Sequence, residues 1–562
     1  MVILGIQKHS HSSACLIEDG KILYFNIEER LSKIKRDNGI PMYCLNEILK
    51  FDKVIDKIVI TGYNYNHEEN IVISKFVEKI GIKLLNAKHN SWYSFYHPHH
   101  LSHAFGAYYN SGFKDALVFV CDGKGSQYFL SNNIRANEST SAYFFSNSNV
   151  DLIFKKLHIN SDISMKPYNQ IDPGDIIFGQ NEKTRFIVTD TVDVGHMYSC
   201  ISESLGFNRD EEGKLMGLQS YGKYNSLFND FVNKDMTINM EYIKGDGNFK
   251  INVEKHPILK QEQNAIDFAY CGQKALEYIN FKTIQDLLEI TKAKNLILTG
   301  GVALNVIANY NFRKMLPKDV KMYVEPICGD EGNSLGAAIG YYKMLNPTKN
   351  IEPLKTNYLN GFTPSYDFKL NSDESIIEVE PKHVIDLILK QNIVAIFQGK
   401  SESGPRALGN RSILFDPRNP NGKNIVNTVK NREAFRPFAC SILKDEANKW
   451  FDMAGLEESP YMMYAMQARE GVKDIIPSVV HVDNTCRIQT VKETDNKILF
   501  ELLTEFYKQT GVPALFNTSF NLAGKVICET IEDALWTLRN SKIEYLYLPD
   551  IGKLVTIKNL PQ

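Results

Sequence analysis

Three stretches of the chain share one pattern, a short apolar strand that runs into a glycine turn. They are 115–121 (DALVFVC), 295–299 (NLILT) and 321–325 (KMYVE). Apolar runs of this length near glycine predict buried strands, and the second and third are each followed by the start of a helix. Strands alternating with helices predict an α/β fold. Because such sheets bind ligands at the carboxyl ends of their strands, polar residues in these turns are candidate site residues.

The histidines are concentrated just before the first of these strands. Five of the thirteen fall within fifteen residues: His89, His97, His99, His100 and His103. Pro98 suits the first position of a helix, which we expect to end near Gly112. On that helix His99 and His103 point the same way, whereas His97 and His100 face elsewhere. With Asp122 they predict a transition-metal site. The alternative is a set of helix-surface and capping histidines.

Two further turns carry candidate ligand contacts. Gly300 and Gly301 follow the 295–299 strand, where backbone N–H groups can approach a phosphate. A tight turn without a ligand is an equal alternative. Asp330 stands before the helix expected at 334–343, at the carboxyl end of a strand. An aspartate there is either a ligand or a helix cap.

The N-terminal residues predict a sheet that opens with hairpins. Residues 2–28 predict three strands, with His9 and His11 in the first turn and Asp19-Gly20 as the second. A polar helix is expected over 28–38, and a strand at 57–62. Three strands, a helix and a strand in this order open the two-lobed ATPase fold shared by actin and the sugar kinases.

The middle of the chain is less regular. Residues 131–150 mix polar turns with short β-like pieces, and 160–190 lack a clear period, so we expect a long insertion or flap within 126–190. Long loops without structure of their own are usually functional lids or disordered segments. The polar stretch 351–375 is expected to link a first domain, 1–350, to a second, 376–562.

The second domain carries the densest polar stretch of the chain, 399–412 (GKSESGPRALGNRS). Seven cationic residues lie here and in the segments that follow, among apolar elements: Arg406, Arg411, Arg418, Lys430, Arg432, Arg436 and Arg487. Such cations suit phosphate and carboxylate groups, although structural pairs with acidic residues must account for some of them. Because aromatic residues are not interleaved for stacking, a small polyanion fits better than a nucleic acid.

Composition limits the class of protein to which this chain can belong. The 562 residues are 43% hydrophobic and 23% charged with a formal net charge of −2, which is ordinary for a globular protein of at least two domains. The nine cysteines are scattered without a C-x-x-C pair, so neither a zinc ribbon nor a disulfide framework is indicated. No signal-peptide pattern and no membrane-spanning apolar run are found. We therefore expect a cytoplasmic protein.

Nine short motifs, spread over nearly the whole chain, resemble those of the O-carbamoyltransferases of nodulation and antibiotic tailoring. They are His11–Ala14, the His99/His103 pair, Asp122-Gly123, 212–221, 300–305, 329–337, 404–412, 432–439 and 517–521. The resemblance implies two domains. The first is like the metal-dependent ATPase-fold subunit of tRNA threonylcarbamoyladenosine synthesis. The second, an α+β domain with a twisted sheet, is like the YrdC enzyme of that pathway.

The resemblance also implies a reaction in two steps. The second domain would form carbamoyl-adenylate from carbamoyl phosphate and ATP with Mg²⁺. The first would move the carbamoyl group onto an acceptor hydroxyl at a metal, iron in the family, for which manganese and zinc are alternatives with these ligands.

Site residues follow from the same resemblance, motif by motif. The implied metal ligands are His99, His103, Asp122 and Asp330. The implied nucleotide-binding residues are Lys124, Gly300, Gly301 and Asn305. Carbamoyl phosphate and the ATP phosphates would be bound by Arg406, Lys430, Arg436, Arg487 and Asn517. Lys430 and Arg436 would also be catalytic, and His11 would be the general base, with His9 as the alternative.

The acceptor is expected to be a small molecule with a free hydroxyl, and the 126–190 insertion is expected to help bind it. A hydroxyl of a nucleoside or of a modified nucleic-acid base is the alternative. Two other functions compete: a tRNA threonylcarbamoyl-type fusion, and a nucleotide sensor built on the actin-like fold. The 404–412 and 432–439 motifs fit the O-carbamoyltransferases better, and a sensor needs no separate metal and basic sites. We expect no membrane partner and a monomer or homodimer.

Overall fold

The computed structural model describes residues 1–62, 77–84, 94–130, 134–146, 149–159, 185–189, 193–208, 210–228, 231–234, 236, 238–239, 243–244, 250–251 and 262–557. The chain divides into two compact units. The first comprises Met1–Phe25 and Asn38–Leu354, and the second comprises Asn26–Asp37 and Lys355–Gln562. Residues Asn26–Asp37 thus group with the second unit, although they lie within the range expected for the first domain.

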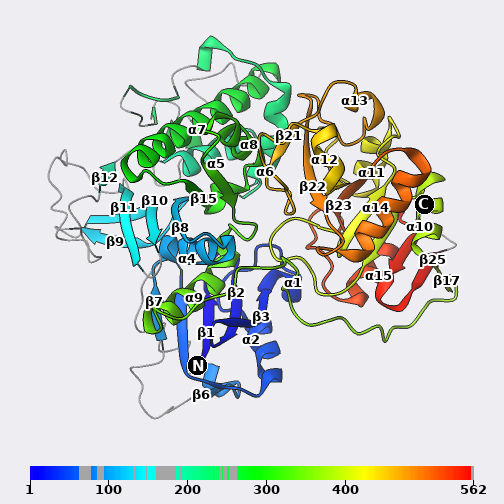
Figure 1. Ribbon diagram of the computed structural model, residues 1–562, viewed down its shortest axis with the longest axis horizontal. Helices are drawn as coiled ribbons and strands as arrows, with labels where there is room; N and C mark the ends of the chain where they lie inside the picture. Colours follow the sequence, from blue (N-terminus) through cyan, green and yellow to red (C-terminus); the bar gives the residue numbers. More distant parts are fainter. Residues whose placement is uncertain are drawn as a thin grey trace. The chain divides into compact units, whose positions relative to one another are not determined.

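The first unit contains two main sheets (Figure 1). One has the strand order β3-β2-β1-β5-β7, formed by β1 (Val2–Gln7), β2 (Ser13–Glu18), β3 (Lys21–Ile27), β5 (Lys57–Thr61) and β7 (Ser94–His97). Strand β1 is antiparallel to β2 on one side and parallel to β5 on the other. The turn at Asp19 and Gly20, both at positive φ, joins β2 to β3 as expected.

The other sheet has the order β12-β11-β10-β8-β15-β16. Its strands are β8 (Asp115–Cys121), β10 (Ile134–Ser146), β11 (Asn149–Ile159), β12 (Arg185–Thr189), β15 (Asn295–Thr299) and β16 (Lys321–Val324). Strand β8 is antiparallel to β10 and parallel to β15, which is parallel to β16.

The two sheets therefore repeat one arrangement. In each, the first strand has an antiparallel hairpin on one side and two parallel strands on the other. The first sheet contains the three strands and the later strand that the sequence predicted as the opening of a two-lobed ATPase fold, and the α/β fold class is confirmed. The expectation of short β-like pieces over 131–150 is wrong, because β10 and β11 form a long antiparallel hairpin. Register shifts at Glu138/Thr140 and Ala142/Tyr143 interrupt its side-chain alternation.

Helices α4 (His99–Ser111) and α9 (Asn333–Leu345) pack together (Figure 1). Two glycines let their backbones approach. A Cβ atom on Gly336 would lie 1.9 Å from the carbonyl oxygen of Ser102, and one on Gly106 would lie 3.4 Å from Cα of Gly336. Helix α9 also packs on β1 and β2. The crossing brings the start of α9 beside the first turns of α4.

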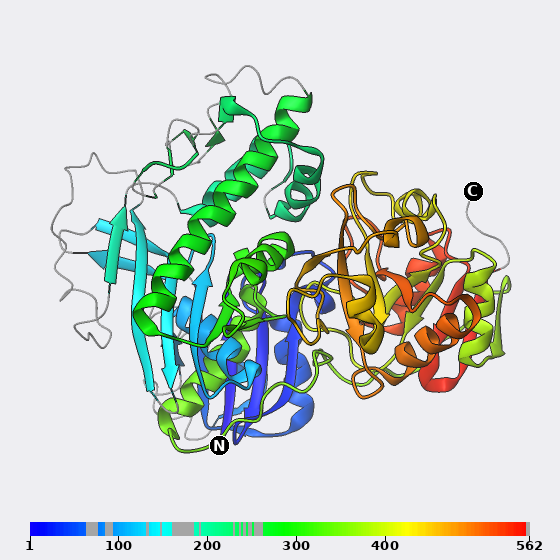
Figure 2. The ribbon, with the colours of Figure 1, turned by 45° about the horizontal axis from the view of Figure 1, so that its top comes forward.

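The remaining elements of the first unit surround these sheets. The 30-residue helix α7 packs against α5, α6 and α8 (Figure 2). These elements are β4 (Val54–Ile55), β6 (Lys83–Leu84), β9 (Gln127–Leu130), β13 (Ile243–Lys244), β14 (Lys250–Ile251), α2 (Met42–Ile48), η1 (Leu49–Phe51), α5 (Val194–Ser204), α6 (Glu212–Leu218), η3 (Gln219–Tyr221), η4 (Ser226–Phe228), α7 (Glu262–Thr291), η7 (Gly301–Leu304), α8 (Val306–Met315) and η8 (Asp330–Gly332).

The second unit is built on one nine-stranded mixed sheet of order β17-β25-β24-β18-β19-β23-β20-β22-β21. Its strands are β17 (Glu374–Glu378), β18 (Val394–Phe397), β19 (Arg411–Phe415), β20 (Ala439–Leu443), β21 (Ala465–Gln467), β22 (Thr485–Val491), β23 (Ala514–Ser519), β24 (Tyr545–Leu548) and β25 (Lys553–Ile557). Its helices include α10 (Pro381–Leu389), α11 (Gly422–Val429), α12 (Lys444–Trp450), α13 (Val472–Ile475), α14 (Lys497–Thr510), α15 (Ile531–Arg539) and η9 (Pro549–Ile551).

Helix α1 (Glu28–Ser32) also belongs to this second unit. The helix expected over 28–38 begins at Glu28 as predicted, but its predicted end is wrong, because Lys33 adopts φ of 64° and ends the helix after Ser32. Arg30 is buried and donates a hydrogen bond to the carbonyl of Gly404 at 2.9 Å. Lys33 forms an ion pair with Asp533. Helix α1 therefore supports the loop that contains Gly404.

The insertion expected over 126–190 is described only in part. Strands β9 to β12 fall within or beside it, whereas 160–184 lies outside the described residues. In the described part of the chain, no helix has the length and apolar character needed to cross a membrane.

Candidate metal centre and cation cluster

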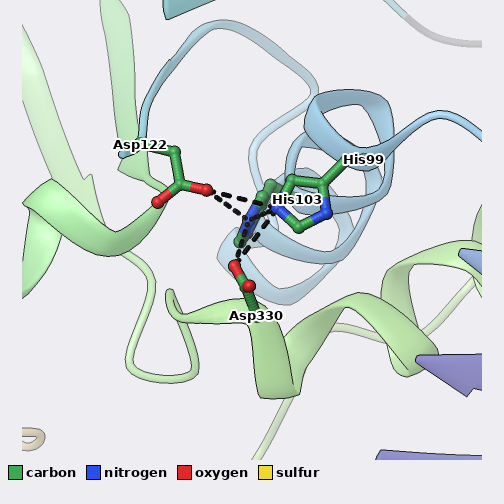
Figure 3. Close-up of side chains that lie close together, drawn as sticks. All are labelled: His99, His103, Asp122 and Asp330. Carbon is green, nitrogen blue, oxygen red and sulfur yellow. Dashed lines mark hydrogen bonds and ion pairs between the residues drawn. The ribbon is translucent and has the colours of Figure 1, made fainter. Parts of the chain in front are cut away.

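Four buried side chains from three elements meet in the first unit (Figure 3). His99 and His103 are one turn apart on α4, Asp122 follows β8, and Asp330 begins η8. Their exposed fractions are 0%, 3%, 7% and 6%. One potential ligand atom from each lies within 4.8 Å of all the others. Strand order explains the meeting, since β8 and β16 are separated only by β15 and present their carboxyl ends at one edge.

The shortest contacts of this cluster run through the Nε2 atom of His99. It lies 3.2 Å from Oδ2 of Asp122, 3.2 Å from Oδ1 of Asp330 and 3.2 Å from Nε2 of His103. The Nε2 atom of His103 is 3.6 Å from Asp330 and 3.9 Å from Asp122. Both imidazoles and both carboxylates thus converge on one small volume.

The electrostatics of the cluster fit a bound cation. Burial alone would lower the pKa of His99, but Asp330 and Asp122 outweigh it and raise that pKa to about 10. The pKa of Asp330 is held well below its usual range, against the effect of burial, by His99 and His103. Two buried carboxylates require positive charge beside them, and two imidazoles with two carboxylates suit iron, manganese or zinc.

A fifth polar group, Asn333, completes this cluster. It is fully buried at the start of α9. Its Nδ2 atom lies 3.3 Å from Nδ1 of His99 and 3.2 Å from Nε2 of His103, whereas its Oδ1 atom is buried without a hydrogen-bond partner. An amide oxygen and nitrogen are interchangeable by a flip of the group, so Asn333 can present either atom to the imidazoles.

The paired glycines lie against Asp122. The backbone N–H of Gly301 donates to Oδ1 of Asp122 at 3.1 Å. Gly300 has φ of 87°, and a Cβ atom there would lie 2.4 Å from the carbonyl oxygen of Cys121. The turn therefore requires glycine for a close backbone approach. The predicted role of both glycines in binding a nucleotide stays a prediction.

Asn305 and Lys124, the other two predicted nucleotide contacts, differ in setting. Asn305 caps α8 by accepting from the N–H of Ala308 at 3.1 Å. Its amide also exchanges hydrogen bonds of 2.8 and 3.1 Å with Gln273. Lys124 is exposed in the turn after Asp122. The capping role of Asn305 is structural, and its predicted contact with a nucleotide is untested.

The predicted base, His11, lies in the turn between β1 and β2. Both His9 and His11 have positive φ, 75° and 51°, and Nδ1 of His11 is 3.0 Å from the hydroxyl of Ser10. Just beyond the turn, the Ser13 hydroxyl donates to the carbonyl of Glu331 at 2.7 Å. The turn is thus tied to the residue that follows Asp330.

His100 faces a different environment from its neighbours on α4. Its Nδ1 atom is 2.8 Å from the hydroxyl of Ser141 on β10. Burial lowers its pKa to about 4. His100 is therefore a neutral packing residue at physiological pH. The side chains of His89 and His97 lie outside the described residues.

In the second unit, cationic side chains cluster around the end of α11. Lys430 is buried, and its ammonium donates to the carbonyls of Ser519 and Asn521, the latter at 2.9 Å. Burial, and then the charges of Arg432 and Arg436, hold the pKa of Lys430 well below its usual range. The like charges are therefore close enough to perturb one another.

Strand register adds two more predicted residues to this cation cluster. Ala439 of β20 pairs with Arg487 on β22 and with Asn517 on β23. Burial and the charges of Arg406, Arg432 and Arg436 depress the pKa of Arg487. Within the described part of the chain, the Arg487 guanidinium has neither a carboxylate partner nor a hydrogen-bond acceptor for Nε. Arg436 forms an ion pair with Glu433 at 3.6 Å. A cluster in which several cations stand beside one such carboxylate is suited to bind an anion.

Two of the seven arginines and lysines noted in the sequence are structural. Arg411 donates to the carbonyls of Gln398 and Gly399 and stacks on the Phe397 ring at 3.8 Å. Arg418 forms an ion pair with Asp416 at 2.7 Å. These two residues therefore hold the fold together and are set apart from the cation cluster.

Comparison with known protein families gives two matches that do not overlap. Residues 68–339 match Carbamoyltransferase N-terminus, and residues 385–553 match Carbamoyltransferase C-terminus. Nodulation protein NolNO of Sinorhizobium fredii (strain NBRC 101917 / NGR234) is 30% identical, over 95% of this chain and 77% of that protein. The chain belongs to the carbamoyltransferase family. It is a carbamoyltransferase-family enzyme, as the motifs predicted.

Two other proteins resemble this carbamoyltransferase. An uncharacterised protein of Methanocaldococcus jannaschii is 32% identical over 88% of this chain and 78% of that protein. Among solved structures, full-length HypF in the phosphate- and nucleotide-bound form covers 62% of this chain and 56% of that one, at 12% identity and a TM-score of 0.36.

Two residues that lie in the two clusters were not assigned a role from the sequence. Asn333 stands three residues after Asp330, one helical turn away, and that spacing was the available signal. Arg432 was noted as a cation but not assigned. It donates to Asn427 at 2.6 Å and stacks on the Phe438 ring at 3.9 Å. Burial and Arg436 lower its pKa to about 9.

Proposed function

We propose that this carbamoyltransferase forms carbamoyl-adenylate at the cation cluster of the second unit and transfers the carbamoyl group to a hydroxyl at the metal centre of the first unit. The observation that carries the proposal is that the described part of each unit holds a polar cluster, and that the two clusters have opposite character. The cluster of His99, His103, Asp122 and Asp330 suits a cation. The cation cluster suits an anion.

Carbamoyl phosphate and the ATP phosphates are the anions that the cation cluster would hold. Lys430, Arg436 and Arg487, with Arg406, Arg432 and Asn517 around them, would neutralise the phosphates. The same charges would also stabilise the negative charge that builds up on the groups in transfer. Lys430 is the best placed to act during the reaction, because it is buried and held by Ser519 and Asn521.

The balance of atoms defines the two half-reactions. Carbamoyl phosphate and water give carbamate and phosphate, and the carbamate oxygen attacks the α-phosphorus of ATP. A bond between that oxygen and phosphorus forms as the bond to pyrophosphate breaks. In the second half-reaction, the acceptor hydroxyl attacks the carbamoyl carbon, AMP leaves, and the hydroxyl proton passes to a base.

In the first unit, the residues have separable proposed roles. A metal held by His99, His103, Asp122 and Asp330, which we propose is iron, would supply Lewis-acid polarisation. Gly300, Gly301, Asn305 and Lys124 would bind the adenylate. His11 would accept the proton of the hydroxyl, because an imidazole titrates near neutral pH. Its turn is tied to Glu331, next to Asp330.

The acceptor is proposed to be a small molecule with a free hydroxyl, bound with help from residues of the 126–190 insertion. Deleting residues 160–185 would then abolish acceptor turnover and leave carbamoyl-adenylate formation intact. Full turnover by that deletion variant would contradict a role in acceptor binding.

The test of the function uses the full-length protein with carbamoyl phosphate, ATP and Mg²⁺. We expect pyrophosphate exchange into ATP that depends on carbamoyl phosphate. We also expect a gain of one carbamoyl mass in a hydroxyl compound when candidate acceptors are screened by mass spectrometry. Absence of any exchange, with or without added iron, would refute the proposal.

A further inference from the structure

A small cavity lies directly beside His103, on the side of α4 that faces residues 325–335. It is lined by His103 and Asn110 of α4, by Glu325 after β16, and by apolar neighbours such as Leu335. The volume open to a water-sized sphere is about 10 Å³. About this volume is needed for one water molecule, provided that polar partners are present. Glu325 and His103 are such partners.

Glu325 is held rigidly at one wall of this cavity. It is 3% exposed. One carboxylate oxygen accepts from Nδ2 of Asn110 and from the backbone N–H of Ile327, both at 3.1 Å. The other accepts from the hydroxyl of Tyr323 at 3.3 Å. A carboxylate offers about four acceptor positions, so three hydrogen bonds leave it able to accept one more.

His103, which also lines the cavity, has a second ring nitrogen, Nδ1, that does not take part in the contacts of the metal centre. In the described part of the chain, all its hydrogen bonds and ion pairs run through Nε2, which faces His99, Asp122 and Asp330. The second nitrogen, Nδ1, lies across the ring from Nε2. Histidines that bind a metal through one nitrogen almost always donate the N–H of the other to a carboxylate, a carbonyl or a water molecule.

We propose that Glu325 is a positioning residue for the metal centre and acts on His103 through one water molecule in this cavity. The water accepts a hydrogen bond from Nδ1–H of His103 and donates one to the carboxylate of Glu325. The proton is thereby kept on Nδ1, and the lone pair of Nε2 is directed at the metal. The inference rests on the proposed function only in requiring a metal at the cluster.

The charge state of Glu325 makes the link measurable. Burial raises the pKa of its carboxyl to about 7. A nearby bound cation favours the carboxylate, so below about pH 7 metal binding expels a proton from Glu325. The other titratable groups around it are His103 on α4 and the hydroxyl of Tyr323, while Asn110 and the Ile327 N–H are neutral. Metal affinity therefore rises with pH through an additional step, which is complete near pH 7 because Glu325 is then already a carboxylate.

The experiment is a titration of metal-free, full-length protein with Co²⁺, followed by visible absorption between pH 5.5 and 8.5. The variant Glu325→Gln is expected to bind Co²⁺ at least roughly tenfold more weakly at pH 7.5 and to lack the step near pH 7. Asp267→Asn is the matched control. Asp267 is also a buried carboxylate of the first unit. It accepts hydrogen bonds from the backbone N–H of Lys223 and from Nε2 of Gln263, and it does not line the cavity.

Glu325→Asp guards against a variant that fails to fold. It keeps the charge but shortens the side chain, so it should retain the pH step with intermediate affinity. The inference would be overturned if Glu325→Gln bound Co²⁺ within twofold of the wild-type affinity and kept the step near pH 7. The proposed function would then still stand. Absence of Co²⁺ binding to the wild-type protein would overturn both the metal centre and the role of Glu325.

Discussion

Substitution of Gly336 by alanine tests how the fold assembles the metal centre. The added Cβ atom would lie 1.9 Å from the carbonyl oxygen of Ser102 and 3.1 Å from the backbone nitrogen of Gly106. Ordinary contact begins near 3.4 Å, so α4 and α9 would have to separate by roughly 1.5 Å. His99 and His103 lie on α4, and Asp330 begins η8, which leads directly into α9. The separation therefore pulls the ligands apart.

Both a stability and a binding change follow from that separation. Overpacking costs about 1–3 kcal/mol, and a rigid backbone carbonyl places this site at the upper end. Alanine recovers about 1 kcal/mol over glycine within a helix, which leaves a net loss of about 2 kcal/mol. Metal–ligand distances tolerate shifts of only about 0.2 Å. Metal affinity should therefore fall by roughly tenfold or more.

Urea unfolding followed by circular dichroism measures the first effect, and Co²⁺ titration measures the second. Gly106→Ala is the matched control for stability, because it is in the same helix crossing and its Cβ atom would meet Cα of Gly336 at an ordinary 3.4 Å. That variant should be as stable as the wild type or slightly more stable. If Gly336→Ala has wild-type stability and Co²⁺ affinity, the crossing does not set the ligand geometry.

Two further predictions concern the second unit. Arg487→Met should stabilise the ligand-free protein by on the order of 1 kcal/mol, because it removes repulsion from Arg406, Arg432 and Arg436. The same variant should reduce pyrophosphate exchange by more than tenfold. Urea unfolding and exchange assays check both, and a destabilised variant would argue against an unmatched charge. Arg30→Met should also reduce exchange, because the Gly404 loop loses its hydrogen bond from α1, while Co²⁺ affinity stays unchanged. Equal effects on exchange and Co²⁺ affinity would indicate general unfolding instead.

The elements predicted best from the sequence are those bounded by strong local signals. The strands expected at 115–121 and 295–299 are β8 and β15 with the same bounds, because an apolar run and a glycine turn define each. Helix α4 ends at Ser111, where Gly112 adopts φ of 72°. The regular hairpin of β10 and β11 was missed because its register shifts interrupt the alternation of polar and apolar residues.

In the candidate site, too, features set by local sequence could be predicted, and features set by long-range packing could not. The i and i+4 spacing of His99 and His103 is a local property and can be predicted. That Asp330, more than two hundred residues later, reaches Nε2 of His99 depends on the approach of α9 to α4 at Gly336, a long-range contact that no local pattern reports. The proposed role of Glu325 likewise has no signal in the sequence, because it arises from packing around a cavity. For Asn333 the three-residue spacing from Asp330 is the one local signal, and its contact with two imidazoles again depends on the fold.

The division of the reaction between the two units is the central claim, and His103→Ala tests it most directly. Both half-reactions are measured on one preparation: pyrophosphate exchange that depends on carbamoyl phosphate, and carbamoyl mass gain on an acceptor. We predict that exchange stays within about threefold of the wild type, because the cation cluster is untouched, whereas carbamoyl transfer and Co²⁺ binding are lost. Equal loss of exchange and transfer in a variant that remains folded would contradict the claim.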